Sequence, residues 1–153
     1  MSPAAAAILL AEEPAFDLVA MLAGLNDGLS RFRLRFHLVS DSGDRIVLSN
    51  GIVEVHLARL LAPLPARRFK AALGARFARL RPNDYATPLA THSAAILIET
   101  RIAPDCAQAV PAETRIVICH AAVLAAQGLA WPGLIHWEQS NTLFLPDEIP
   151  PVE

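Results

Sequence analysis

Residues 31–58 read RFRLRFHLVSDSGDRIVLSNGIVEVHLA, and the pattern of this stretch indicates the fold class. From 31 to 39 apolar residues alternate strictly with Arg and His, which is typical of a strand with one face in a core and the other in water. Residues 41–44 are turn formers, and Asn50-Gly51 is a strong hairpin signal because both residues tolerate positive φ. The stretch therefore predicts an antiparallel meander with strands at 31–39, 46–48 and 53–57.

The segments on both sides of this meander follow strand or helix patterns. An apolar run at 6–11 predicts a buried strand, and the spacing of apolar residues at 16–29 predicts a helix. After the meander, the pattern predicts an amphipathic helix at 66–80 and a Pro-rich linking loop at 81–92. The remaining predictions are a strand at 93–100, a helix at 112–127 between Pro111 and Gly128, and strands at 134–137 and 143–145.

Two short runs suggest an internal repeat. AAILL at 6–10 resembles AAILI at 94–98, and each run is followed by an acid, a proline, a helix and a hairpin. The shared order predicts two similar β-α-β-β halves, ferredoxin-like repeats, at 4–60 and 91–148, linked by the helix at 66–80. The predicted fold is α+β, a single domain over 1–153 with a mainly antiparallel sheet and helices on one side of it.

Composition indicates a compact chain in a reducing compartment. The 153 residues are 54% hydrophobic and 18% charged, which suits one globular domain. The basic residues are almost all arginine, which is typical of a GC-rich bacterial genome, and Cys106 and Cys119 form no C-x-x-C pair. The uncharged stretch 116–135 has the length of a membrane span, but Gln127, Gly128 and Pro132 interrupt it. We therefore expect a cytoplasmic protein with no membrane segment.

Charge is distributed unevenly along the chain. The net formal charge is −4 over 1–30, +8 over 31–81 and −6 over 82–153. The basic stretch could meet the chain's own acidic segments, a second copy in a homodimer, an acidic protein partner or, least favoured, nucleic acid, because the overall pI of about 6.2 is low for a nucleic-acid domain. The candidate partner-binding residues lie on the predicted strand and helix: Arg31, Arg33, Arg35, Arg67, Arg68 and Lys70.

The motifs of the commonest enzymes are missing from the sequence. It contains no G-x-G-x-x-G, no phosphate loop, no His-Glu-x-x-His and no G-x-S-x-G. Cys119 and His120 are neighbours on a predicted helix, where side chains diverge by about 100°, so Cys119 is interpreted as a core residue and not as a nucleophile. Since no two histidines have metal-ligand spacing, we predict no metal, no cofactor and no catalytic residue.

A second candidate site lies in the C-terminal half. His92, His136, Trp137 and Ser140 are near the ends of predicted strands and could form a polar and aromatic rim for a small ligand. The alternative interpretation places Trp137 in the core and Ser140 in a simple turn.

The same half carries a family resemblance. The run THSAAILI at 91–98, the apolar helix after it and LIHWEQS at 134–140 together resemble the bacterial domain of unknown function 4261 family, mainly over residues 91–146. Ile135-His136-Trp137 departs from the family pattern, which has Tyr-Trp there. The resemblance implies no activity. The sequence therefore favours a non-catalytic protein-interaction domain, with small-molecule binding or an enzyme as the alternative and nucleic-acid binding as the second alternative.

Overall fold

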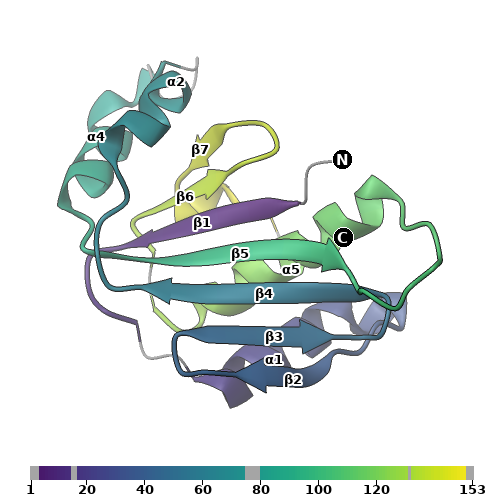
Figure 1. Ribbon diagram of the computed structural model, residues 1–153. Helices are drawn as coiled ribbons and strands as arrows, with labels where there is room; N and C mark the ends of the chain where they lie inside the picture. The colour runs from purple at the N-terminus through teal and green to yellow at the C-terminus, as the bar shows by residue number, and fades with distance from the viewer. Residues whose placement is uncertain (1–3, 15–16, 75–79, 131, 151–153) are drawn as a thin grey trace.

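The computed structural model describes residues 4–14, 17–74, 80–130 and 132–150 (Figure 1). Within these residues seven strands form one sheet in the order β2-β3-β4-β5-β1-β6-β7, and each neighbouring pair is antiparallel. The strands are β1 (Ala5–Leu10), β2 (His37–Asp41), β3 (Arg45–Ser49), β4 (Val53–Leu60), β5 (Ala94–Ile102), β6 (Leu134–Trp137) and β7 (Thr142–Phe144). The predicted α+β class with an antiparallel sheet is confirmed.

Helices α1 (Leu18–Leu29) and α5 (Ala112–Gln127) lie side by side behind the sheet (Figure 1). Their close approach requires Gly24, because a Cβ atom there would lie 3.1 Å from the Cβ of Ala125. Helix α5 has the predicted bounds, with Pro111 and Gly128 at its ends. Helix α1 begins at Leu18 because the Asp17 carboxylate accepts the N–H of Ala20; the predicted start at Phe16 lies outside the described residues.

Strand β1, near the N-terminus, pairs on both sides with strands from the second half of the chain. It lies between β5 and β6, so the connection through α5 passes over it. All six of its residues are buried, because alternate side chains enter different clusters on the two faces of the sheet. Ile8 packs toward α1 and α5, and Leu9 packs toward the opposite face.

The opposite face is covered at one end by short helices. The 3₁₀ segment η2 (Ala66–Phe69), α2 (Lys70–Leu73) and α4 (Pro82–Thr91) lie at the upper left of Figure 1 and bury Phe69, Tyr85 and Leu89. The prediction that helices lie on one side of the sheet therefore holds for α1 and α5, and these short helices add a partial layer on the other side. The first half supplies four strands and the second three, so the ferredoxin-like repeat remains a prediction.

Three predicted elements differ from the structure, and the first two are the strand at 31–39 and the loop at 81–92. The strand predicted at 31–39 begins only at His37, because residues 30–32 continue α1 as a 3₁₀ segment, η1 (Ser30–Phe32). The loop predicted at 81–92 is helix α4: Pro82 occupies its first turn, where a missing N–H costs nothing, and the helix also accommodates Pro88.

Of the helix predicted at 66–80, residues 66–69 form a 3₁₀ turn and residues 70–73 form one α-helical turn capped by Gly74, whereas residue 80 is helical as predicted. The residues after it, 75–79, lie outside the described part of the chain. None of the helices in the described residues combines the length and apolar character of a membrane span.

Candidate functional site

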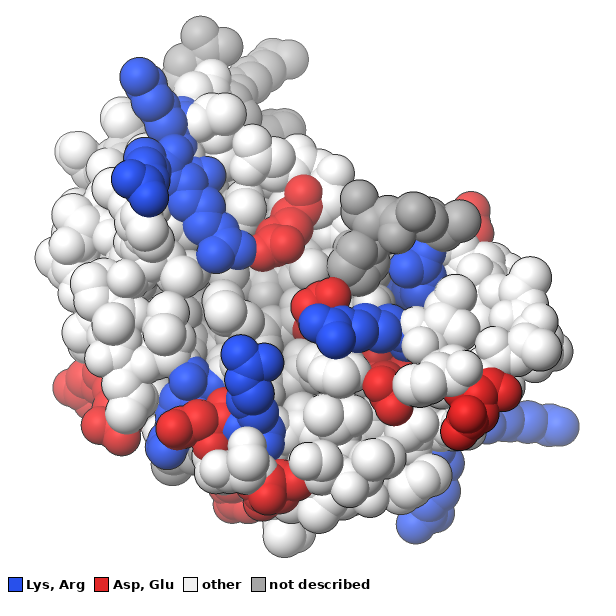
Figure 2. Space-filling model, in the orientation of Figure 1, with Lys and Arg blue, Asp and Glu red and all other residues white. Residues whose placement is uncertain are grey.

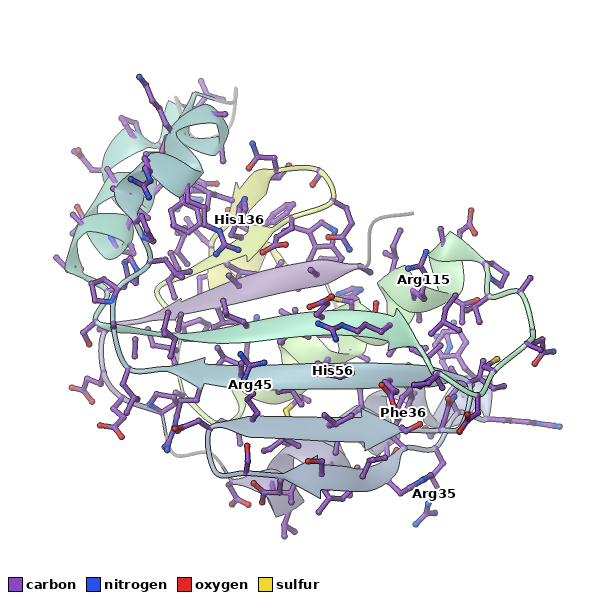
Figure 3. All side chains as sticks on the ribbon, viewed as in Figure 1. Arg35, Phe36, Arg45, His56, Arg115 and His136 are labelled. Carbon is purple, nitrogen blue, oxygen red and sulfur yellow. The ribbon has the colours of Figure 1, made fainter. Side chains whose placement is uncertain are left out.

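The arginines of the segment 31–35 lie where α1 ends and before β2 begins. Arg33 closes η1 with φ of 58°, and its N–H donates to the Ser30 carbonyl at 3.1 Å. This segment is not a strand, and its side chains alternate only from 33 to 36: Phe36 is fully buried and Leu34 packs on the core, whereas Phe32 and the three arginines are exposed. Figure 3 shows Arg35 extending away from the body of the molecule.

Asn26 of α1 fixes this segment in place. Its Oδ1 accepts the Phe36 N–H at 2.7 Å, and its Nδ2 donates to the Phe36 carbonyl at 3.0 Å. The amide thus satisfies both backbone groups of Phe36, as a neighbouring strand would. No local pattern in the sequence connects residues 26 and 36, so this contact could not be predicted.

An apolar pocket opens beside the segment. We call it the basic-end pocket; it has a volume of about 350 Å³ and is lined by Phe32, Leu34, Glu113, Thr114 and Val117. The Arg31 guanidinium lies over the Phe32 ring, with Cζ 5.0 Å from the ring centroid, within the range of a cation–π interaction. Within the described residues, Arg31, Arg33 and Arg35 form no ion pair with a carboxylate.

The second group of predicted partner-binding residues lies elsewhere. Segment η2–α2, with Arg67, Arg68 and Lys70, contacts β7, whereas the first group adjoins β2 at the other edge of the sheet. Figure 2 shows the two groups as blue side chains at the upper left and the lower right. Arg68 donates to the Glu138 carboxylate, so this group is partly paired within the chain. The single basic surface predicted from the sequence is therefore two separate surfaces.

The structure separates the predicted rim of His92, His136, Trp137 and Ser140. His92 is buried, and both of its ring nitrogens bond backbone groups: Nε2 accepts the Leu64 N–H at 2.8 Å, and Nδ1 donates to the Leu89 carbonyl at 2.6 Å. No ring nitrogen is left for a ligand.

His136 and Trp137 are neighbours on β6 and therefore point to opposite faces of the sheet. The His136 ring is buried against Phe69, with centroids 4.9 Å apart, and its Nε2 bonds Asn141 Oδ1 at 2.8 Å. Trp137 and Ser140 instead line an aromatic pocket on the α5 side together with His120 and Phe144. His120 lies on another element, α5, and no sequence pattern connects it with this pair.

Another charged cluster lies on the uncovered face of the sheet. Its side chains form hydrogen bonds with one another. His56 Nε2 lies 2.9 Å from Glu54 Oε1, and Arg101 donates to both oxygens of Glu99 at 2.9 and 3.0 Å (His56 is labelled in Figure 3). The hydrogen bonds from Arg101 lower the pKa of the Glu99 carboxyl below its ordinary value. The groups of this cluster therefore satisfy one another.

Nucleophile and metal chemistry gain no support from the described residues. Cys119 is fully buried, and burial raises the pKa of its thiol to about 12, so it is protonated at neutral pH. In the described ranges, three or more His, Cys, Asp or Glu side chains never gather closely enough to hold a metal ion.

Comparisons with family models, with curated proteins and with solved structures find no match for the chain. The resemblance to the domain of unknown function 4261 family therefore remains a prediction, and function has to be argued from the site.

Proposed function

We propose that this chain is a protein-interaction domain that binds an acidic segment of a partner through the end of the molecule formed by η1, residues 33–36 and the first turns of α5. One observation carries the proposal: Phe32 and Leu34, which line an apolar pocket, alternate along the chain with Arg31, Arg33 and Arg35, and these arginines have no carboxylate partner in the described residues.

The basic-end pocket and the arginines beside it would contact different parts of a bound segment. An apolar side chain that enters the basic-end pocket would contact Phe32, Leu34 and Val117 and exclude water from them, as the central anchors of interfaces do. The guanidinium groups around it would attract carboxylates and set the orientation of the bound segment. Glu113, on the opposite wall, would repel the same carboxylates, so the acidic residues of the partner should lie on the η1 side.

The distribution of charge favours a protein partner over nucleic acid. A nucleic-acid strand follows a continuous track of basic residues, because each phosphate carries a charge. Here the two basic groups lie at opposite edges of the sheet, and the one at α2 is partly paired with Glu138. The surface at η1 is compact, which suits a short acidic segment.

The test uses two short fluorescein-labelled peptides of Asp and Glu, one with a central Phe and one with Ala in its place, and measures fluorescence anisotropy. We expect the peptide with Phe to bind more tightly than the one with Ala. The double variant Arg31→Glu/Arg35→Glu should weaken binding by about tenfold or more, which corresponds to roughly 1.4 kcal/mol. Glu113→Gln should strengthen it.

Arg67→Glu/Lys70→Glu is the matched control, because it changes the net charge equally at the other edge of the sheet and should leave binding unchanged. Equal losses from the two double variants would show that only the net charge matters. Tighter binding of single-stranded DNA than of either peptide, lost on Arg31→Glu/Arg35→Glu, would replace a protein partner by nucleic acid.

A further inference from the structure

A second pocket lies at the other edge of the sheet, on the side of α5. Its volume is about 280 Å³, and it is formed by α5, β6, β7, the turn between those strands and the segment after β7. The six lining residues are mostly aromatic or apolar: His120, Trp137, Ser140, Phe144, Ile149 and Pro150. We call it the aromatic pocket.

The rings of this pocket are held in place by specific contacts. His120 and Trp137 meet edge to face, with centroids 6.3 Å apart and an interplanar angle of 84°. Because a carbonyl oxygen can only accept, His120 Nε2 donates its proton to the Pro150 carbonyl at 2.7 Å. In the neutral ring Nδ1 is then an unprotonated acceptor.

Ser140 supplies the other polar group of the lining. Its backbone carbonyl accepts from Thr142 Oγ1 at 3.1 Å, whereas its hydroxyl makes no hydrogen bond within the described residues. The pocket therefore combines aromatic walls with a serine hydroxyl and an imidazole acceptor.

We propose that the aromatic pocket binds a small planar aromatic molecule that carries one hydrogen-bond donor, of the size of a phenol or an indole. Aromatic rings prefer edge-to-face or offset contacts with other rings, and Trp137, Phe144 and His120 offer such contacts. A cavity of about 150 Å³ can hold benzene, so this pocket has room for one ring and a polar substituent. The donor would pair with His120 Nδ1 or with the Ser140 hydroxyl.

This ligand site is independent of the proposed protein-binding surface. Trp137 and Ser140 line the aromatic pocket at the β6–β7 edge, whereas the basic-end pocket is built on η1 beside the edge strand β2. Loss of one function would therefore leave the other in place.

The test compares three probes by titration of the ¹⁵N-labelled full chain, followed by amide chemical shifts. Phenol has the aromatic ring and the donor, toluene lacks the donor, and cyclohexanol has the hydroxyl without the ring. We expect phenol to shift the amides of Trp137, Ser140 and Phe144 saturably. Toluene and cyclohexanol should each bind about fivefold more weakly, because each lacks one of the two interactions.

Two variants locate the site. Ser140→Trp places a large side chain at the exposed mouth and should abolish the phenol shifts, whereas Ser42→Trp, in the exposed β2–β3 turn, is the matched control and should not. His120→Lys keeps a donor for Pro150 but offers no acceptor in place of Nδ1, so it should reduce the preference for phenol over toluene.

Any of three results would overturn the proposal. These are the absence of saturable shifts with phenol, binding of cyclohexanol as tight as that of phenol, and persistence of the phenol shifts in Ser140→Trp. If Ser140→Trp does not fold, an unchanged phenol preference in His120→Lys together with unshifted Trp137 and Phe144 amides decides against the site.

Discussion

The segments 31–36 and 66–73 both combine basic residues with phenylalanine, but their surroundings differ. Each carries exposed basic residues around a fully buried Phe, Phe36 in one and Phe69 in the other. In segment 66–73, Arg68 meets Glu138, and the adjoining α4 pairs Arg81 with Asp84. In segment 31–36, the described residues provide no carboxylate partner. The number of arginines in a segment therefore says less about binding than the number left without an internal partner.

The largest effect is expected from Asn26→Ala, which removes the contact that holds segment 31–36. The N–H and the carbonyl of Phe36 would both lose their hydrogen-bond partners in a partly buried place. We expect a loss of about 2–3 kcal/mol in the free energy of unfolding, measured by urea denaturation, and weaker binding of the acidic Phe peptide.

Asn26→Asp is the control, since its carboxylate still accepts the Phe36 N–H but cannot donate to the carbonyl. It should lose less stability than Asn26→Ala. If Asn26→Ala were as stable as the parent, the amide would not be what positions the arginines.

The next effect concerns Tyr85 of α4, the helix that contacts α2 of segment 66–73. Tyr85, the chain's one tyrosine, is buried and donates to Glu148 Oε1 at 2.6 Å; burial first and this hydrogen bond second raise its pKa to about 12. Because the folded state favours the protonated phenol, its contribution is complete below pH 10 and is lost as the pH rises toward about 12. Tyrosinate absorbance should therefore titrate near pH 12.

Tyr85→Phe should cost about 1–2 kcal/mol of stability at neutral pH and remove the alkaline loss between pH 10 and about 12. Binding of the acidic peptide should not change, because Tyr85 packs on the other face of the sheet. A tyrosine that titrates near pH 10 would contradict the buried hydrogen bond.

The smallest effect is expected from Glu138→Gln, which leaves Arg68 without its carboxylate. Both side chains are partly exposed, so stability should fall by at most about 1 kcal/mol in thermal unfolding. This variant makes segment 66–73 more like segment 31–36 in charge, but it creates no pocket. If Glu138→Gln restored tight binding of the acidic Phe peptide to Arg31→Glu/Arg35→Glu, in which the basic end is disabled, free arginines without an apolar pocket would be sufficient.

Most of the fold could be predicted where local signals agreed. Helix α5 has its predicted bounds because Pro111 and Gly128 mark its ends, and Asn50-Gly51 marks the turn between β3 and β4. The errors occurred where contacts between residues distant in sequence outweigh the local pattern of apolar and polar residues. Alternation at 31–36 predicted the inward side correctly for Leu34 and Phe36 but not for Phe32, which is exposed, and the segment pairs with Asn26 and not with a strand. Helix α4 was missed because its prolines suggested a loop.

The candidate sites were less predictable than the fold. Arg31, Arg33 and Arg35 were identified from charge alone, yet the pocket beside them needs Val117 of α5, which is distant in sequence. The predicted rim failed as a unit because His136 and Trp137 alternate across β6, and because backbone groups occupy both nitrogens of His92. Trp137 and Ser140 did come together, with His120 as the partner that only the fold supplies.

The position of β1 has a consequence for how the chain is made. Ile8 pairs with Ile96 on one side and with Ile135 on the other, so β1 is synthesised well before either neighbour. Until β6 leaves the ribosome, a nascent chain carries an apolar strand with at least one unpaired edge. Such an edge is prone to aggregation because it can pair with a strand of another chain. Such distant pairings also slow folding. We therefore expect chains truncated before residue 134 to accumulate as insoluble material, with β1 at the centre of the aggregates.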